Sequence, residues 1–228
     1  MVTVAVRAER VGATRERILA AAERLFAEHG VVAVSNRQVS EAAGQGNNAA
    51  VGYHFGTKAD LVRAIVRSHA ERIEGLRRRA LGEAEGSAEA RDWVACLVRP
   101  ITEHLDALGR PTWFARFGAQ VMTDPVLRGI MIEEALTSPS LVRIVEELDR
   151  CLPELPPEVR AERNAMASQL MVHMCAERER ALAEGLPTPR PSWDDAATGL
   201  IDAITALWTA PVTAVPARMG VTRQEGTR

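Results

Sequence analysis

Apolar residues in this chain recur at intervals of three and four, the spacing that places side chains on one face of an α-helix. Ile18, Ala22, Leu25 and Phe26 form the first such stripe, and another ends at Trp208. Aromatic residues make up only 4% of the sequence, which argues against a β-sandwich or barrel because aromatic and β-branched side chains line sheets. Alanine, leucine, arginine and glutamate dominate, and these residues favour helix. The sequence therefore predicts an all-α fold.

Glycines and prolines separate these stripes and predict about nine helices. We expect a flexible arm over residues 1–13 and a first helical unit over residues 14–60, whose first helix is capped by Thr14. A second, larger helical unit is expected over residues 61–211, followed by a flexible tail over residues 212–228.

Several classes of protein are disfavoured by the sequence. It contains no run of eighteen apolar residues, so we expect no membrane-spanning segment. The first residues lack the apolar core of a signal peptide. Cys96, Cys151 and Cys175 are an odd number of widely spaced cysteines, which predicts neither a disulfide framework nor a zinc site. We therefore expect a protein of the reducing cytoplasm, with no metal or other cofactor and no membrane partner.

Charge is unevenly distributed along the chain. Residues 1–80 hold 13 Arg or Lys against 8 Asp or Glu, whereas residues 81–228 hold 15 against 22. A basic first part suggests that this end meets a polyanion. The alternative is a chance excess of solvated arginines, and charge alone does not separate the two interpretations.

Two short predicted helices follow the first long one. Ser35 and Gln38 form a capping box at the start of the first, and Gly44 ends it after about two turns. The second is expected from about Asn47 or Asn48 to Phe55, a residue we place in the core. Two short helices joined by a glycine-containing turn are typical of a helix-turn-helix, although many such pairs never contact DNA.

The stretch from Thr14 to Val66 resembles the start of a TetR-family transcriptional regulator. The resemblance lies in the run ILAAAERLFAEHG at residues 18–30 and in YHFGTKADL at residues 53–61, which contains Lys58, the only lysine of the chain. It implies an all-helical homodimer whose N-terminal helix-turn-helix domain binds a palindromic double-stranded DNA operator. The C-terminal helices would then form a domain for dimerisation and for binding a small-molecule effector.

The resemblance also implies base contacts. Arg37 matches a position at which the family often contacts a base, and its guanidinium fits the O6 and N7 acceptors of guanine. Asn48 can pair with adenine, and Ala49 and Ala50 can meet thymine methyl groups. Asn47 either reads a base or caps the helix. The turn before this helix is one residue longer than the commonest family form, so the register of these contacts is open by one position.

Other positions match family contacts to the DNA backbone. Tyr53, His54 and Lys58 are expected to hold phosphates. Thr57 is expected to cap the next long helix, whose N-terminal amides can also bind a phosphate. Gly52 departs from the family pattern, because a tyrosine often stands at this position and offers a hydroxyl for phosphate.

The effector pocket and the dimer interface are assigned from apolar patterning and the resemblance together. An apolar or aromatic effector is expected, with His104, Asn164 or His173 binding its polar group. The candidate effector-binding residues are His104, Trp113, Phe114, Phe117, Met122, Met166, Leu170, His173 and Met174. The alternative interpretation of the apolar ones is that they only fill the core. The candidate dimer residues are Leu200, Ile201, Ile204, Leu207 and Trp208.

The remaining histidines and cysteines have plainer interpretations. His29, His69 and His104 are expected at the surface or at helix ends rather than as metal ligands. His173 and Cys175 lack a further ligand at matching helical spacing, which disfavours a metal site. Cys175 could act as a redox sensor only if its thiol pKa were lowered.

These observations predict a repressor that a small effector releases from its operator. A transcriptional activator and a ligand-independent repressor of the same fold remain alternatives. An enzyme is disfavoured, because the sequence offers no nucleophile–base–orienter set, no glycine-rich phosphate loop after a strand and no metal-ligand spacing.

Overall fold

The computed structural model describes residues 2–47 and 49–213, with side chains from residue 11 onward. This part of the chain contains ten helices and no strand. The helices are α1 (Val2–His29), α2 (Asn36–Ala42), α3 (Ala50–Phe55), α4 (Lys58–Glu83), α5 (Ala90–Leu108), α6 (Phe114–Thr123), α7 (Pro125–Leu136), α8 (Pro139–Cys151), α9 (Pro157–Ala183) and α10 (Trp193–Thr209). The all-α prediction is confirmed.

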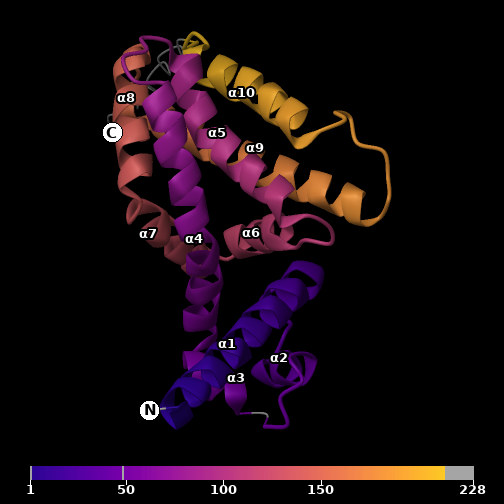
Figure 1. Ribbon diagram of the computed structural model, residues 1–228. Coiled ribbons are helices and arrows are strands. Elements are labelled where there is room, and N and C mark those ends of the chain that lie inside the picture. Colours follow the sequence, from indigo (N-terminus) through magenta and orange to yellow (C-terminus); the bar gives the residue numbers. More distant parts are fainter. Residues whose placement is uncertain (1, 48, 214–228) are drawn as a thin grey trace, which may run out of the picture.

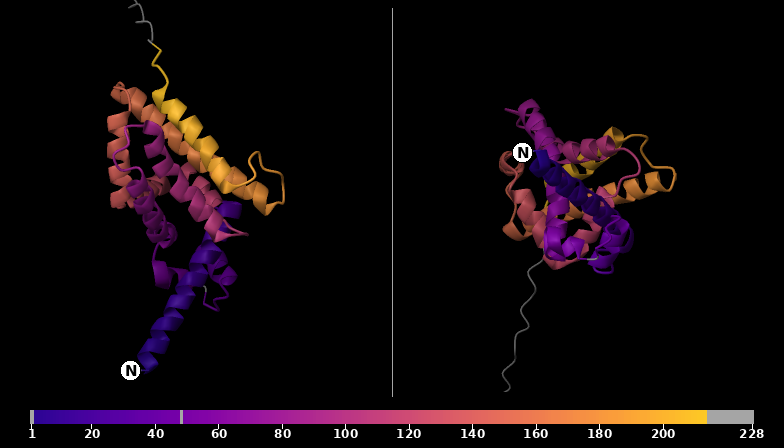
Figure 2. Two further views of the ribbon diagram at one scale, coloured as in Figure 1. Left: turned by 45° about the horizontal axis from the view of Figure 1, so that its top comes forward. Right: turned by 60° about the horizontal axis from the view of Figure 1, so that its bottom comes forward.

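The helices form two units that α4 connects (Figure 1). Helices α1, α2 and α3 lie together at one end, and α4 runs from them into a larger bundle that contains α5 and α8 to α10. Helices α6 and α7 lie at the junction, where α6 packs on both α1 and α9. Figure 2 shows the first helix projecting away from the bundle, at the end opposite the last turn of α10. This arrangement presents the small unit at a free end of the molecule.

Local sequence explains the main helix boundaries. The Ser35–Gln38 and Thr57–Asp60 capping boxes are both present, so each satisfies backbone N–H groups that the first helical turn leaves unpaired. Gly44 has φ = 67°, a left-handed conformation that favours glycine, and it turns the chain out of α2. The predicted short helix pair therefore forms, with α3 beginning at Ala50 rather than at Asn47 or Asn48.

Two sequence expectations about the elements are wrong. The chain is helical from Val2, in place of the loose arm expected for residues 2–13, and Thr14 is inside α1 rather than its cap. Residues 7–10 are Arg, Ala, Glu and Arg, which favour helix and extend it backwards. The ten helices of the described residues agree with the expected number of about nine, and the difference arises because the region expected to end at about Leu152 divides at Pro139 into α7 and α8. Of the expected tail, residues 214–228 lie outside the described residues.

Two clusters of buried residues support the fold. The first joins α1 to α4 with α6 and α7, and it includes Phe26 and Phe117, whose stacked rings are 6.4 Å apart. The second fills the larger bundle around α5, α9 and α10. The first cluster crosses the predicted domain boundary at residue 60, because Leu61, Val62 and Ile65 of α4 belong to it. The core of the small unit is therefore continuous with the junction helices.

Charged groups fasten the junction as well. The buried carboxylate of Glu134 in α7 accepts hydrogen bonds from Arg63 at 2.7 Å and from Arg67 at 2.6 and 2.9 Å, both on α4. The carboxylate of Glu179 in α9 is 1% exposed and accepts from the backbone amides of Ala115 and Arg116 at the start of α6. Because each carboxylate has several donors, α6 and α7 are held at both sides of the junction.

Candidate functional site

The α2–turn–α3 pair presents an exposed polar face. Arg37 on α2 is largely exposed, and its Nε donates to Glu41 at 2.7 Å, so this pair holds the guanidinium along the helix. The hydrogen bond to Glu41 raises the pKa of Arg37, which therefore stays charged. Tyr53 on α3 is 82% exposed, with its ring edge-on to His54. A helix pair with such a surface fits the shape of a DNA-reading element.

Asn47, Ala49 and Ala50, at the start of α3, lie in three different environments. The Asn47 side chain accepts a hydrogen bond from the Ala49 amide at 2.9 Å in the turn before α3, while the N-cap residue of α3 is Ala49, without a side-chain hydrogen bond. Ala49 is exposed, as a base contact requires. Ala50, in contrast, is buried in the core of the small unit, and its expected contact with a thymine methyl group is wrong. Asn48 lies outside the described residues.

The residues expected at phosphates lie near the junction of α3 and α4. Thr57 is exposed and exchanges hydrogen bonds with Asp60. Lys58 is half-buried, and its Nζ donates to the carbonyls of Val31 at 3.0 Å and Val32 at 3.4 Å. An ammonium group carries three donors, so one is left for a phosphate after these two bonds. His54 is half-buried beside them.

Sequence reasoning did not single out Arg15, which fixes α3 against α1. Its Nη1 donates to the His54 carbonyl at 2.5 Å, and its guanidinium lies 4.3 Å from the centre of the Phe55 ring. A cation over an aromatic face is a favourable contact. Arg15 is the basic residue nearest the start of the expected helix, a position that periodicity alone does not distinguish from a solvated arginine.

The larger bundle contains a cavity of about 530 Å³, within the size range of small-molecule sites. Side chains from α4 to α10 line it, most of them apolar. They include Leu97, Ile101 and Leu105 of α5, Phe114, Gly118 and Met122 of α6, Met131 and Ile132 of α7, Val145 and Leu148 of α8, Met171 and Cys175 of α9, and Ile204 and Trp208 of α10. The site is therefore suited to an apolar molecule.

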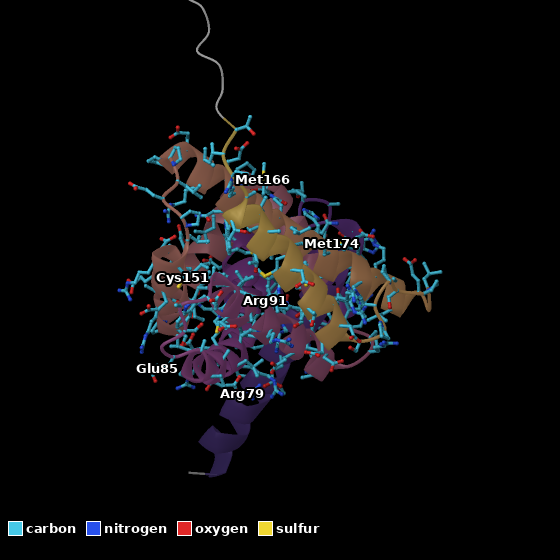
Figure 3. All side chains as sticks on the ribbon, turned by 90° about the horizontal axis from the view of Figure 1, so that it is seen from above. Arg79, Glu85, Arg91, Cys151, Met166 and Met174 are labelled. Carbon is cyan, nitrogen blue, oxygen red and sulfur yellow. The ribbon has the colours of Figure 1, made fainter. Side chains whose placement is uncertain are left out.

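Only two of the nine expected effector residues, Phe114 and Met122, line this cavity. The other seven lie elsewhere: His104, Trp113, Phe117, Met166, Leu170, His173 and Met174. Phe117 contacts Phe26 of α1, although it lies only three residues from Phe114 on α6. Met166, His173 and Met174 are exposed on α9, and the two methionines are labelled in Figure 3. The sequence predicted correctly that α6 and α9 contribute to the cavity, but not which side of each helix faces it. On α9 the apolar residues surround most of the helix, so their spacing does not identify one inward side.

His69 and His104 are not surface groups. Glu23 of α1, His69 of α4 and His104 of α5 form a chain, with Oε2 of Glu23 3.0 Å from Nε2 of His69 and Nδ1 of His69 2.8 Å from Nε2 of His104. The His69 ring stacks on Phe114, with centroids 3.9 Å apart. Burial, aided by the charges of His69 and Arg72, lowers the pKa of His104 to about 4. The chain thus joins the small unit to the wall of the cavity.

A few polar groups also line the cavity: Arg77, Asp149, Asn164 and Ser168. Of the three expected polar partners for an effector, only Asn164 is among them. Asp149 pairs with Arg160 at 2.5 Å. Burial raises the pKa of the Cys175 thiol to about 12. A thiol with a raised pKa is the opposite of what a redox sensor needs, so the structure disfavours that role.

The residues expected at the dimer interface lie in the core of the single chain. Leu200, Ile201, Ile204 and Trp208 are buried, and Leu207 is half-buried against the same cluster, where α10 packs on α5. The four buried residues are covered by α5 within the same chain and do not offer a surface to a partner subunit, whereas the contact expected of Leu207 stays a prediction. Within the described residues, no cluster of His, Cys, Asp or Glu could hold a metal ion, and no helix is long and apolar enough to cross a membrane.

A helix-turn-helix unit attached to a hollow helical bundle defines the class of this protein. Residues 18–65 match the family model described as bacterial regulatory proteins, tetR family, and residues 95–206 match the tetracyclin repressor-like C-terminal domain. The two matches together span most of the chain, and the chain belongs to the TetR family.

Individual relatives agree with this assignment. The HTH-type transcriptional repressor AcnR of Corynebacterium glutamicum is 29% identical over 137 residues, which cover 58% of this chain and 63% of AcnR, less than two thirds of that relative. The fold is similar to that of the HlyIIR mutant protein, with a TM-score of 0.54 at 14% identity over 88% of this chain and 99% of that one. It is also similar to PfmR from Thermus thermophilus, with a TM-score of 0.51 at 19% identity, covering 83% and 97% of the two chains.

Proposed function

We propose that this protein is a DNA-binding transcriptional repressor, released from a palindromic operator when a small apolar or aromatic molecule occupies the cavity. The observation that carries this proposal is the position of α6. Phe114, Gly118 and Met122 of α6 line the cavity, and Phe117 and Val121, on the adjoining strip of the same helix surface, pack into the core of the helix-turn-helix unit. A ligand that displaces α6 therefore acts directly on α1.

The contacts of α6 support a transmitted movement. Its N-terminal end is held by Glu179 of α9, while its middle packs on Phe26 of α1. Phe114 also stacks on His69, which reaches Glu23 of α1 through a hydrogen bond. A shift of Phe114 would thus act on α1 along two routes, and release of DNA follows when the bound ligand favours the shifted arrangement.

Binding of a palindrome requires a homodimer, and we place its contact on the outer side of α9 and α10. Met166 and Met174 are 46% and 49% exposed along α9, beside α10 (Figure 3). Ala203 and Ala206 are exposed on α10, and small side chains let a partner helix approach closely. Two helices from each subunit would then bring the reading units to half-sites about 34–36 Å apart, one turn of DNA.

The test uses genomic fragments captured by the purified protein, measured by fluorescence anisotropy. Arg37→Ala should weaken binding about 5- to 150-fold, the usual range for one base contact, and relax discrimination at one base. Arg143→Ala, which changes an exposed ion pair with Glu85 in the larger bundle, away from α9 and α10, is the matched control and should leave binding unchanged. Failure of the wild type to select any fragment, or equal loss with both variants, would contradict the proposal.

Two alternatives keep the same fold. An activator would raise rather than lower transcription from a promoter next to the captured site, which a reporter measurement distinguishes. A ligand-independent repressor is disfavoured by the size and apolar lining of the cavity. Enzyme activity is disfavoured by membership of a regulatory family, and conversion of a bound ligand would revive it. Because an operator-binding protein acts where the bacterial DNA is, we also propose that it works in the cytoplasm.

A further inference from the structure

Arg77 is the feature of the cavity that the function above leaves unexplained. It projects from α4, lines the otherwise mainly apolar cavity and is largely buried. Among the described residues, no carboxylate lies within 4.0 Å of its guanidinium. Its one hydrogen bond there is a long contact of 3.4 Å from Nη1 to the Ser138 hydroxyl, and its Nε is buried without a partner. Burial lowers the pKa of Arg77, as expected for a cation removed from water.

The other buried arginines of the bundle are better satisfied. Arg163 donates to the carbonyls of Trp208 at 2.9 Å and Pro211 at 3.3 Å. Arg178 also has a buried Nε without a partner, but it donates to the carbonyl of Arg190 at 2.7 Å and lies over the Trp193 ring. Within the part of the chain that the structure describes, Arg77 has neither a carbonyl nor an aromatic partner. A buried charge of this kind destabilises the protein unless hydrogen-bond acceptors or an opposite charge surround it.

The nearest carboxylate does not pair with Arg77. Glu74, one turn earlier on α4, accepts hydrogen bonds from the hydroxyls of Ser138 and Ser140 and from the Ser140 amide. Burial alone would raise the pKa of Glu74, but these hydrogen bonds, together with the nearby charge of Arg77, outweigh it and the pKa is lowered. The carboxylate is therefore ionised, and its oxygens accept hydrogen bonds from the start of α8 rather than from Arg77. The guanidinium therefore remains available to a group that enters the cavity.

Resting on the proposed function, we propose that the effector is an apolar carboxylate, whose anionic group binds Arg77 while its hydrocarbon or aromatic body fills the cavity. Arginine matches a carboxylate because both are planar and can form paired hydrogen bonds. Asn164 and Ser168 of α9, which also line the cavity, add hydrogen-bonding groups. Ile132 and Val145 combine lining positions with exposures of 51% and 42%, which gives an apolar approach between α7 and α8.

The experiment compares two probes of equal length, decanoate and 1-decanol, by tryptophan fluorescence, since Trp208 lines the cavity. The wild type should bind decanoate at least about ten-fold more tightly than decanol at about pH 7.5, the range expected of a charged hydrogen bond. Arg77→Met should remove that preference by weakening decanoate about 10- to 100-fold, with decanol changed less than about three-fold. Arg79→Met, two residues along the same helix and exposed, should bind both probes like the wild type.

The melting temperature of Arg77→Met is a second measurement, which distinguishes a ligand-binding arginine from one that only supports the fold. Loss of an unsatisfied buried cation should leave the melting temperature of the free protein unchanged or higher, whereas a merely structural arginine would lower it. Equal affinity of the wild type for both probes, binding of neither, or a preserved preference in Arg77→Met would overturn the proposal. Capture of genomic DNA is measured separately, so a protein that binds DNA but not decanoate contradicts only the ligand assignment.

Discussion

The small unit and the larger bundle use burial in opposite ways. In the small unit, Ile18, Phe26, Val39 and Val51 pack into one core and are almost completely buried. In the bundle, apolar side chains surround about 530 Å³ of space, and the largely buried charge of Arg77 stands at its wall. A filled core favours one rigid arrangement of its helices. A core with a cavity allows a bound ligand to shift the equilibrium between two arrangements of the helices. The comparison predicts which substitutions should cost most.

The largest difference is expected between two phenylalanines on α6. Phe117→Ala empties a position in the filled core and should cost about 3–5 kcal/mol of unfolding free energy. Phe114→Ala enlarges an existing cavity and should cost less than half as much, because one side of that ring already lacks contacts. Urea denaturation of both variants measures this, and equal losses would contradict the division between filled and hollow cores.

The buried histidine chain should make the junction sensitive to acid. The pKa of His104 is about 4 in the folded protein against 6.5 for an ordinary histidine, so the unfolded chain binds the proton first. Stability is thus complete above about pH 6.5 and falls as the pH drops toward about 4. Linkage gives a loss of up to about 2 kcal/mol at about pH 5 from this group, reduced by whatever screening water supplies. Thermal melts at neutral pH and at about pH 5 should show a smaller difference in His104→Gln than in the wild type.

Lys58 tests whether the small unit is held together by the groups that would bind DNA. Lys58→Met should cost about 1 kcal/mol of stability by leaving the Val31 and Val32 carbonyls without their donor. It should also weaken all DNA sequences alike and lower the salt slope of binding by about one. A loss of stability with an unchanged salt slope would assign the residue to structure alone.

The smallest effect concerns the helix caps of the small unit. Ser35→Ala and Thr57→Ala each remove a side chain that accepts from a backbone amide, and each should cost about 1 kcal/mol. Thr137→Ala, whose hydroxyl donates to the Glu134 carbonyl in α7, should cost less, since that carbonyl belongs to a helix end that water can reach. Larger losses from Thr137 than from the caps would contradict this ranking.

The small unit could be predicted from the sequence better than the bundle, for physical reasons. Capping boxes and left-handed glycines act within four residues, so Ser35, Gly44 and Thr57 were visible in the sequence as boundaries. The inward face of α9 depends instead on neighbours far along the chain. Periodicity therefore misplaced Met166 and Met174, and it assigned the α10 stripe to a partner subunit when α5 covers it.

The same limit applies to individual polar residues. Arg77 and Glu179 look like ordinary solvated charges of helices rich in Arg and Glu. Only their tertiary surroundings distinguish them. Ala50 failed as a contact for a related reason, because the register of a six-residue helix decides which of two adjacent alanines faces outward.

The two adjoining strips of α6, one on the cavity and one in the core of the small unit, have a consequence for the engineering of biosensors. Positions 114, 118 and 122 can be randomised to change which compound is detected. Positions 117 and 121 are kept, so that ligand binding in the cavity still acts on the helix-turn-helix unit. Gly118 borders the cavity, and a Cβ added there would meet no heavy atom of a surrounding residue within 4 Å. This position therefore offers a starting point for a selection toward smaller or differently shaped compounds.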